Sequence, residues 1–173
     1  MFIIILITFL AILSAACSNI EEQAVNGDSL KVNQAKKSSN DNFYSILKFV
    51  DGDTYWVNDG SSKGIKVRLI GINSPEPRSY FKIKEERFGK EASEFMEKLV
   101  GSKQIRLELD VQEIDQFGRV LAYCYFKDGR MINEEMVKNG FAQVATYPPN
   151  VKYQDMFIVA QKYAREHRLG MWE

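Results

Sequence analysis

Short apolar runs separated by turn residues dominate the chain from residue 43 onward. In 104–111, apolar Ile105, Leu107, Leu109 and Val111 alternate with polar residues, which predicts a strand with one buried face. Glycine, asparagine and aspartate between the runs predict turns. The predicted strands are 43–50, 54–57, 65–70, 104–111 and 120–126.

Longer segments with apolar residues at helical spacing lie between and after these strands. The predicted helices are 85–100, 131–140 and 151–168. Their apolar stripes are predicted to face the core: Phe88, Ala92, Phe95, Met96 and Leu99, then Ile132, Met136 and Val137, then Met156, Phe157, Ala160, Tyr163 and Ala164. Strands and helices in this order predict an α+β domain over 42–173.

The N-terminal segment has a different composition. Residues 2–16 are apolar apart from Thr8 and Ser14, and this run is shorter than the ~20 residues that a membrane-spanning helix needs. We therefore predict an export signal over 1–17. Residues 18–41 are polar and contain no aromatic residue, so they cannot bury enough apolar surface to offset the entropy cost of ordering. We predict a disordered linker there.

The cysteine at the end of the apolar run has two interpretations. Ser14-Ala15-Ala16-Cys17 resembles the lipobox of bacterial lipoproteins, in which the cysteine is acylated. Ser14 stands where leucine is usual, and no Lys or Arg precedes the run, so a plain cleaved signal remains the alternative. Acylation of Cys17 predicts a membrane lipoprotein, and cleavage predicts a secreted protein. The second cysteine, Cys124, has apolar neighbours and is predicted to be a small core residue.

Charge is balanced along the whole chain, with 23 Lys and Arg against 23 Asp and Glu. Because non-specific nucleic-acid binding usually rests on a basic surface, a nucleic-acid enzyme of this composition must use local cations. The candidates are Lys82, Lys84, Arg87, Arg68 and Arg119. For Lys82 and Lys84, a solvated loop is an equally good explanation.

Three motifs carry candidate chemistry. Asp51-Gly52-Asp53-Thr54 joins two predicted strands, and 67–76 reads Val-Arg-Leu-Ile-Gly-Ile-Asn-Ser-Pro-Glu. Downstream, 115–119 reads Asp-Gln-Phe-Gly-Arg just before another apolar run. Acidic groups that can hold a hard cation, next to two guanidinium groups, indicate a site for a phosphate ester. The only histidine, His167, has no partner motif and is predicted to lie on the surface, which argues against a catalytic triad.

In this order and spacing, the motifs resemble those of the thermonucleases, the staphylococcal-nuclease-like enzymes. The resemblance covers about Phe43 to Trp172 and includes Phe-Gly-Lys-Glu-Ala-Ser at 88–93, Leu-Ala-Tyr at 121–123 and Tyr-Pro-Pro-Asn at 147–150. It implies a five-stranded Greek-key barrel of the oligonucleotide/oligosaccharide-binding (OB) kind with about three packed helices.

The resemblance also implies a calcium site formed by Asp53, the Asn73 side chain and the Ser74 backbone carbonyl. Asn73 departs from the family pattern, which has aspartate there. The change removes one negative charge from the ligand set, so weaker metal binding is expected rather than lost activity. By the same resemblance, Asp51 is a turn former near the metal and not a ligand.

The remaining roles follow from the same resemblance. Glu76 aligns with the general base or water-positioning group, and Arg68 and Arg119 align with the arginines that grip the phosphate. Tyr147 aligns with a loop that clamps the nucleotide, although an X-Pro turn that simply ends a strand is nearly as good an explanation. Asp115 is expected to brace its own turn.

Together these observations predict a monomeric, exported, calcium-dependent endonuclease that hydrolyses DNA and RNA without sugar specificity. The alternative is a non-catalytic nucleic-acid-binding module, since degenerate copies of this domain serve that role. Such copies lose the site arginines or glutamate, whereas Arg68, Glu76 and Arg119 are all present. A peptide- or glycan-binding barrel is a third possibility, but it leaves the paired arginines unexplained.

Overall fold

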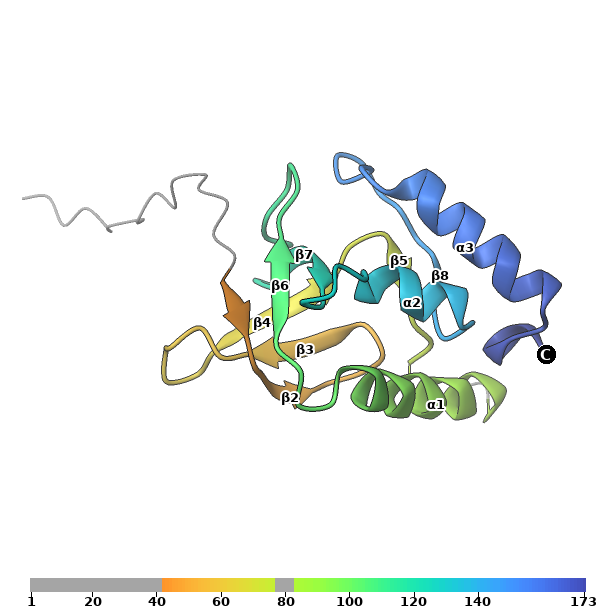
Figure 1. The fold of residues 1–173 in the computed structure, drawn as a ribbon, viewed down its shortest axis with the longest axis horizontal. Coiled ribbons are helices and arrows are strands. Elements are labelled where there is room, and N and C mark those ends of the chain that lie inside the picture. The colour runs from red at the N-terminus through yellow and green to blue at the C-terminus, as the bar shows by residue number, and fades with distance from the viewer. Residues whose placement is uncertain (1–41, 77–82) are drawn as a thin grey trace, which may run out of the picture. The chain divides into compact units, whose positions relative to one another are not determined.

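A curled β-sheet with three α-helices packed around it forms the domain (Figure 1). The computed structural model describes residues 42–76 and 83–173. The predicted signal, the predicted linker and the sites proposed at Cys17 and Lys82 lie outside the described residues. The backbone of Lys84 is described but its side chain is not. No helix in the described ranges is long and apolar enough to cross a membrane.

The main sheet has six strands in the order β1-β6-β7-β4-β3-β2. Neighbouring strands are antiparallel except for β4 and β7, which run parallel. The strands are β1 (Phe43–Tyr44), β2 (Ile46–Phe49), β3 (Thr54–Val57), β4 (Ile65–Leu69), β6 (Ile105–Glu108) and β7 (Val120–Tyr125).

One stretch of chain supplies both ends of this strand order. The predicted strand 43–50 is divided at Ser45 into β1 and β2. Phe43 pairs with Arg106 on one side, whereas Ile46 pairs with Val57 on the other. Because β1 and β2 follow each other directly, the sheet curls round until its two ends meet. The prediction of an α+β, OB-type barrel with three helices is therefore confirmed.

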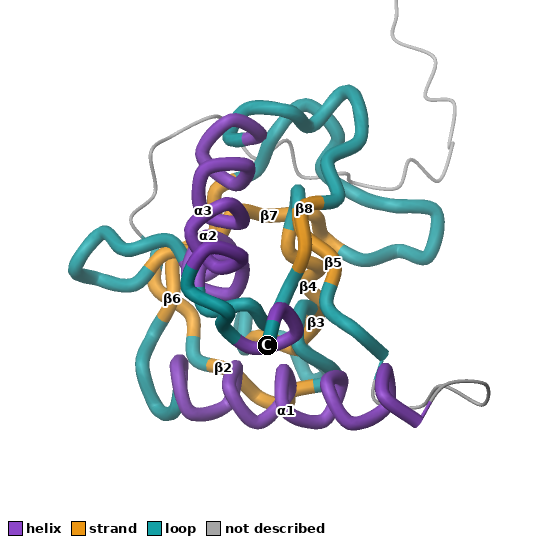
Figure 2. Tube along the Cα trace, turned by 90° about the vertical axis from the view of Figure 1, so that its right-hand side faces the viewer, coloured by secondary structure: helices purple, strands orange, loops and turns teal. Residues whose placement is uncertain are grey.

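The helices are α1 (Ile83–Val100), α2 (Ile132–Lys138) and α3 (Gln154–Glu166), and a short 3₁₀ turn, η1 (Gly170–Trp172), follows. Helices α2 and α3 pack against each other on one side of the sheet, and α1 crosses its lower end (Figure 2). Most of the predicted stripe residues are buried or packed against the core. Fully buried side chains include Tyr55, Leu69, Met96, Ile132 and Phe157.

Cys124 is fully buried and forms no disulfide with another described residue, as predicted for a core residue. Tyr163 is an exception to the predicted stripe of α3, because its side chain is 41% exposed. Its ring stacks on His167 with the centroids 4.0 Å apart. His167 lies on the surface, as predicted.

The predicted strand 104–111 is too long. Strand β6 ends at Glu108, and Leu109 and Val111 are 43% and 74% exposed. Asp110 explains the early end, because its carboxylate accepts the backbone N–H of Val111 at 2.9 Å and the Tyr123 hydroxyl at 3.0 Å. An aspartate that bonds to its own following backbone competes with strand pairing.

Two short strands were not predicted. Strands β5 (Ile72–Asn73) and β8 (Gln143–Val144) form a separate antiparallel pair. Ile72 lies opposite Val144, and Asn73 lies opposite Gln143. This pair fixes the backbone of the 67–76 motif, so it positions the candidate site.

Candidate active site

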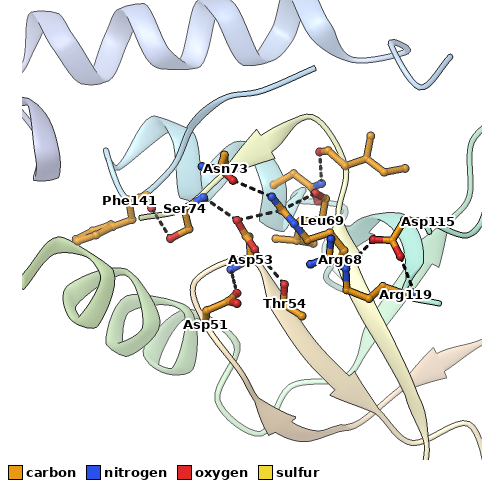
Figure 3. Close-up of polar contacts among 12 residues, drawn as sticks. Asp51, Asp53, Thr54, Arg68, Leu69, Asn73, Ser74, Asp115, Arg119 and Phe141 are labelled. Atoms are coloured by element: carbon orange, nitrogen blue, oxygen red, sulfur yellow. Dashed lines mark hydrogen bonds and ion pairs between the residues drawn. The ribbon is translucent and has the colours of Figure 1, made fainter. Parts of the chain in front are cut away.

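The Asp51-Gly52-Asp53 turn between β2 and β3 places one carboxylate inside the protein (Figure 3). Asp53 is 5% exposed. Its Oδ2 accepts the backbone N–H of Ser74 at 2.6 Å, and its Oδ1 accepts the Thr54 hydroxyl at 3.1 Å. Asp51 accepts the Asp53 backbone N–H at 3.0 Å, so it shapes the turn, in agreement with its expected role as a turn former.

Gly52 allows the turn to lie directly against the 67–76 segment. A Cβ at this position would overlap the Ser74 hydroxyl oxygen and would lie 2.9 Å from the Ala92 Cβ. Only a residue without a side chain fits without movement of these neighbours. The glycine of Asp-Gly-Asp is therefore required by close packing between two parts of the site.

Arg68 lies on β4, where it is paired with Thr54 of β3. Its Nη1 is 3.0 Å from Asp53 Oδ2 and donates to the Leu69 carbonyl at 3.0 Å. Its Nη2 donates to Asn73 Oδ1 at 3.1 Å. The side chain is 15% exposed. Arg68 is thus held by partners from three segments, with its guanidinium between Asp53 and Asn73 (Figure 3).

Asn73 and Ser74 are held by contacts with the 141–145 segment. Besides the β5–β8 pairing, Ala145 N–H donates to the Gly71 carbonyl at 2.9 Å. The buried Ser74 hydroxyl donates to the Phe141 carbonyl at 3.1 Å. Asn73 itself is exposed.

Burial sets the electrostatics of Asp53. Loss of water around its carboxylate raises its pKa to about 7, and the neighbouring Asp51 charge acts in the same direction. The Arg68 guanidinium and the Ser74 N–H oppose the rise. Arg68 and the Ser74 N–H therefore offset only part of the cost of burying ionised Asp53, and any further positive charge nearby stabilises this ionised form.

Arg119 is held within one turn of chain. Asp115 Oδ2 accepts from Arg119 Nε at 2.6 Å, and Asp115 Oδ1 accepts the backbone N–H groups of Phe117 and Arg119, each at 2.9 Å. Burial raises the Asp115 pKa, but the Arg119 and Phe117 hydrogen bonds outweigh it, so the net pKa is lowered. The carboxylate therefore stays ionised, and Asp115 braces its turn as expected.

A pocket of about 620 Å³ brings the two arginines together. Tyr147, which is 75% exposed, lies on its rim. The pocket is lined by Arg68, Leu69, Ile70, Gly71, Ile72, Gln112, Asp115, Gln116, Phe117, Arg119, Leu121, Ala145, Tyr147, Pro148 and Asn150. Two guanidinium groups that line one cavity suit the oxygens of a phosphate group.

The predicted base does not line this pocket. Glu76 is exposed, at the end of the described stretch 42–76, and it is not among the residues that line the pocket. Lys82 and the Lys84 side chain lie outside the described residues. Asn150 and Gln112 line the pocket but were not predicted as site residues, because their contact joins positions that are far apart in sequence.

The predicted metal ligands fit a hard cation. Within 42–76 and 83–173, no cluster of three or more His, Cys, Asp or Glu side chains could hold a metal ion. The candidate set instead combines one carboxylate, one carboxamide and one peptide carbonyl, all of which are oxygen donors that calcium accepts. Asp53 Oδ2 and Asn73 Oδ1 are both bonded to the Arg68 guanidinium, so a cation held by the same oxygens would have to share them with Arg68.

The fold is a small α+β barrel, and its arginine-lined pocket lies beside a buried carboxylate. These features indicate a class of proteins that bind phosphate esters. Comparison with known proteins agrees. A family model described as staphylococcal nuclease homologue matches residues 66–173. Relatives include the thermonuclease of Staphylococcus intermedius, 36% identical with 96% of each chain covered, and that of Staphylococcus hyicus, 36% identical with 78% of each covered. Endonuclease YncB of Bacillus subtilis is 34% identical over 74% of this chain and 60% of its own length.

The chain belongs to the staphylococcal nuclease family. Its similarity to thermonucleases and an endonuclease identifies it as an enzyme of the phosphodiester hydrolase class. The family prediction made from the motifs is confirmed.

Proposed function

We propose that this protein is a calcium-dependent, sugar-nonspecific endonuclease that acts on DNA and RNA. The observation that carries the proposal is the shared pocket of Arg68 and Arg119, with Asp53 and Asn73 next to Arg68. Similarity to two thermonucleases and an endonuclease supports the reaction class. The two arginines bind the phosphate, and Arg119 also stabilises the departing oxygen.

In this proposal Asp53, Asn73 and the Ser74 carbonyl hold the calcium ion. Calcium, when bound, supplies positive charge for the phosphoryl oxygens and an ordered water. The protein contributes the geometry: Ser74 N–H fixes Asp53, and the β5–β8 pair fixes the backbone of Asn73. Because Asn73 is neutral, we expect weaker calcium binding than with aspartate at this position.

Glu76 acts as the general base or positions the attacking water. Its exposure leaves the carboxylate free to reach a bound substrate. Tyr147 stacks against the nucleotide from the pocket rim, and Lys82 and Lys84 add local positive charge for the polynucleotide. These roles follow the family motifs residue by residue.

The direct test is cleavage of plasmid DNA and of RNA by the purified full chain with calcium, magnesium or chelator. We expect cleavage of both polymers with calcium and none with chelator. Glu76→Gln, Arg68→Ala and Arg119→Ala should each reduce the rate by about 10²–10³-fold. Lys48→Gln is a matched control, because Lys48 is exposed, lies outside the pocket and should have no effect. A Glu76→Gln variant as active as the parent would contradict the assigned role. A parent that binds DNA without cutting it would favour the non-catalytic module.

Export is part of the same proposal, with Cys17 acylated and residues 18–41 acting as a flexible leash to a monomeric nuclease. A leash of that length has a root-mean-square reach of roughly 25–30 Å. Cys17→Ala should lose metabolic palmitate labelling and release the protein from membranes. Equal labelling of parent and variant would make a plain secreted nuclease the better explanation.

A further inference from the structure

Three separate segments of the chain line the pocket, 68–72, 112–121 and 145–150, and one side chain joins two of them, which we call the first and second walls. The first wall is the 112–121 segment that carries Arg119. The second wall is the 147–150 turn, which begins with Tyr147. Asn150 closes this turn, because its N–H donates to the Tyr147 carbonyl at 3.1 Å. Asn150 is 5% exposed, which is unusual for a polar side chain unless its hydrogen bonds are satisfied.

The Asn150 carboxamide bonds to both polar groups of one residue in the opposite wall. Gln112 N–H donates to Asn150 Oδ1 at 2.8 Å, and Asn150 Nδ2 donates to the Gln112 carbonyl at 2.8 Å. The two bonds resemble a hydrogen-bonded residue pair between antiparallel strands. Only one orientation of the amide satisfies both, so asparagine fits here and aspartate does not.

We propose that Asn150 is a positioning residue that sets the width of the nucleotide pocket. It holds the Tyr147 turn against the segment that carries Arg119. The inference rests on the proposed nuclease function of the same pocket. Asp115 holds Arg119 by separate hydrogen bonds, so removal of Asn150 leaves the guanidinium in place. The effect should therefore fall on substrate binding rather than on the chemical step.

A second link between nearby segments provides a matched control. Lys152 Nζ and the Tyr153 hydroxyl both donate to Glu108 Oε1, at 2.6 and 2.8 Å. This link joins β6 to the start of the α3 region, but none of its members lines the pocket. Lys152→Met removes the salt bridge, and Tyr153 still bonds to Glu108. If contacts between these segments mattered only for folding, Asn150→Ala and Lys152→Met should behave alike in kinetics.

The first experiment compares steady-state kinetics of the full chain on a single-stranded DNA oligonucleotide with calcium. We expect Asn150→Ala to raise KM about tenfold while kcat stays within about twofold. Lys152→Met should leave both constants unchanged. A merely structural role lowers the folded fraction, so it lowers kcat at constant KM, and that result overturns the proposal. Asn150→Asp should resemble Asn150→Ala, because a carboxylate cannot donate to the Gln112 carbonyl.

A double-mutant cycle tests whether Asn150 acts through Tyr147. In a Tyr147→Ala background, Asn150→Ala should change KM by less than about twofold, whereas additive effects overturn the proposal.

Fluorescence anisotropy of the same oligonucleotide bound to Glu76→Gln gives a readout without cleavage. Weaker oligonucleotide binding after Asn150→Ala in that background supports the positioning role, whether or not the parent cuts DNA. A parent that binds DNA without cutting it would contradict only the nuclease proposal. Unchanged binding overturns positioning, and a parent that neither cuts nor binds overturns both.

Discussion

The two arginines of the pocket are held by different kinds of structure. Arg119 takes its ion pair from Asp115, four residues earlier, within a single turn. Arg68 takes its contacts from Asp53 on the β2–β3 turn and from Asn73 on β5. The Asp53 side chain is 7% exposed and that of Asp115 is 13% exposed. One arginine is thus positioned locally, and the other depends on the assembled barrel.

The difference has consequences for stability. A local turn can keep its ion pair while the rest of the fold loosens, whereas the Arg68 contacts exist only when several segments meet. The buried Asp53 also depends on Arg68 for compensation of its charge. Changes near Arg68 should therefore cost more folding free energy than equivalent changes near Arg119.

The largest expected effect is a difference in stability between variants of the two arginines. At pH 8, Arg68→Ala removes the guanidinium that lowers the pKa of the buried Asp53, so Asp53 either takes up a proton on folding or stays charged without compensation, and the free energy of unfolding should fall by about 2–3 kcal/mol. Arg119→Ala leaves the Asp115 backbone hydrogen bonds intact and should cost about 1 kcal/mol or less. Urea unfolding of both variants measures the difference. Equal losses would show that the comparison is wrong.

A second test disturbs the packing of the turn that carries Asp53 without removing a charge. Gly52→Ala forces a methyl group onto Ser74 and Ala92, and overpacking of this kind should cost about 1–3 kcal/mol. Ser74→Gly in the same chain removes the hydroxyl that clashes and should recover part of the loss. Gly60→Ala is the control, since no atom lies within 4 Å of its added Cβ, although its φ of 90° adds backbone strain. If thermal unfolding shows no recovery in the double variant, the clash is not with Ser74.

A third test sharpens the role of Asn73 beside Arg68. Asn73→Asp adds a charged oxygen to the proposed ligand set, so half-maximal nuclease activity should need several-fold less calcium. Calcium titration of parent and variant measures this shift. Gln143→Glu adds a charge to the residue paired with Asn73, outside the ligand set, and serves as the control for a general electrostatic effect. An identical calcium dependence for parent and Asn73→Asp would mean that Asn73 does not contact the metal.

The smallest effect concerns the local turn. The folded-state pKa of Asp115 lies below its ordinary value of about 3.9, so its stabilising contribution is present above that value and is lost as pH falls through the folded pKa. Asp115→Asn should therefore be less stable than the parent at pH 7, and the gap should narrow by pH 3. Urea midpoints at the two pH values measure it. A gap that stays constant with pH would assign the loss to packing instead.

The sequence predicted what is local or strongly periodic. Asp-x-Phe-Gly-Arg indicated the Arg119 turn because its partners lie within five residues, and the helices followed from their apolar stripes. The alternation over 104–111 predicted a strand that is too long, because the Asp110 carboxylate accepts the backbone N–H of Val111. A count of apolar residues does not include this competing hydrogen bond. Strands β5 and β8 were missed because two-residue strands give no periodic signal.

The contacts that join distant segments also could not be predicted from the sequence. The motifs alone placed Arg68 near Asp53, but nothing in the sequence linked Asn150 to Gln112 or Ser74 to the Phe141 carbonyl. Each of these bonds uses a backbone group, and every residue other than proline offers the same donor and acceptor. The residue type at the position that supplies the backbone group therefore does not indicate that the bond forms.

The division of one strand at Ser45 has a consequence for the order of folding. Residues 46–49 need only the hairpin partner that follows them, whereas Phe43 and Tyr44 must wait for Arg106 and Ile105, far along the chain. Contacts of such long sequence separation carry the entropy cost of a large loop, so they tend to form late and slow the overall rate. The β2–β3–β4 meander is expected to form early, and the β1–β6 contact to complete the barrel last.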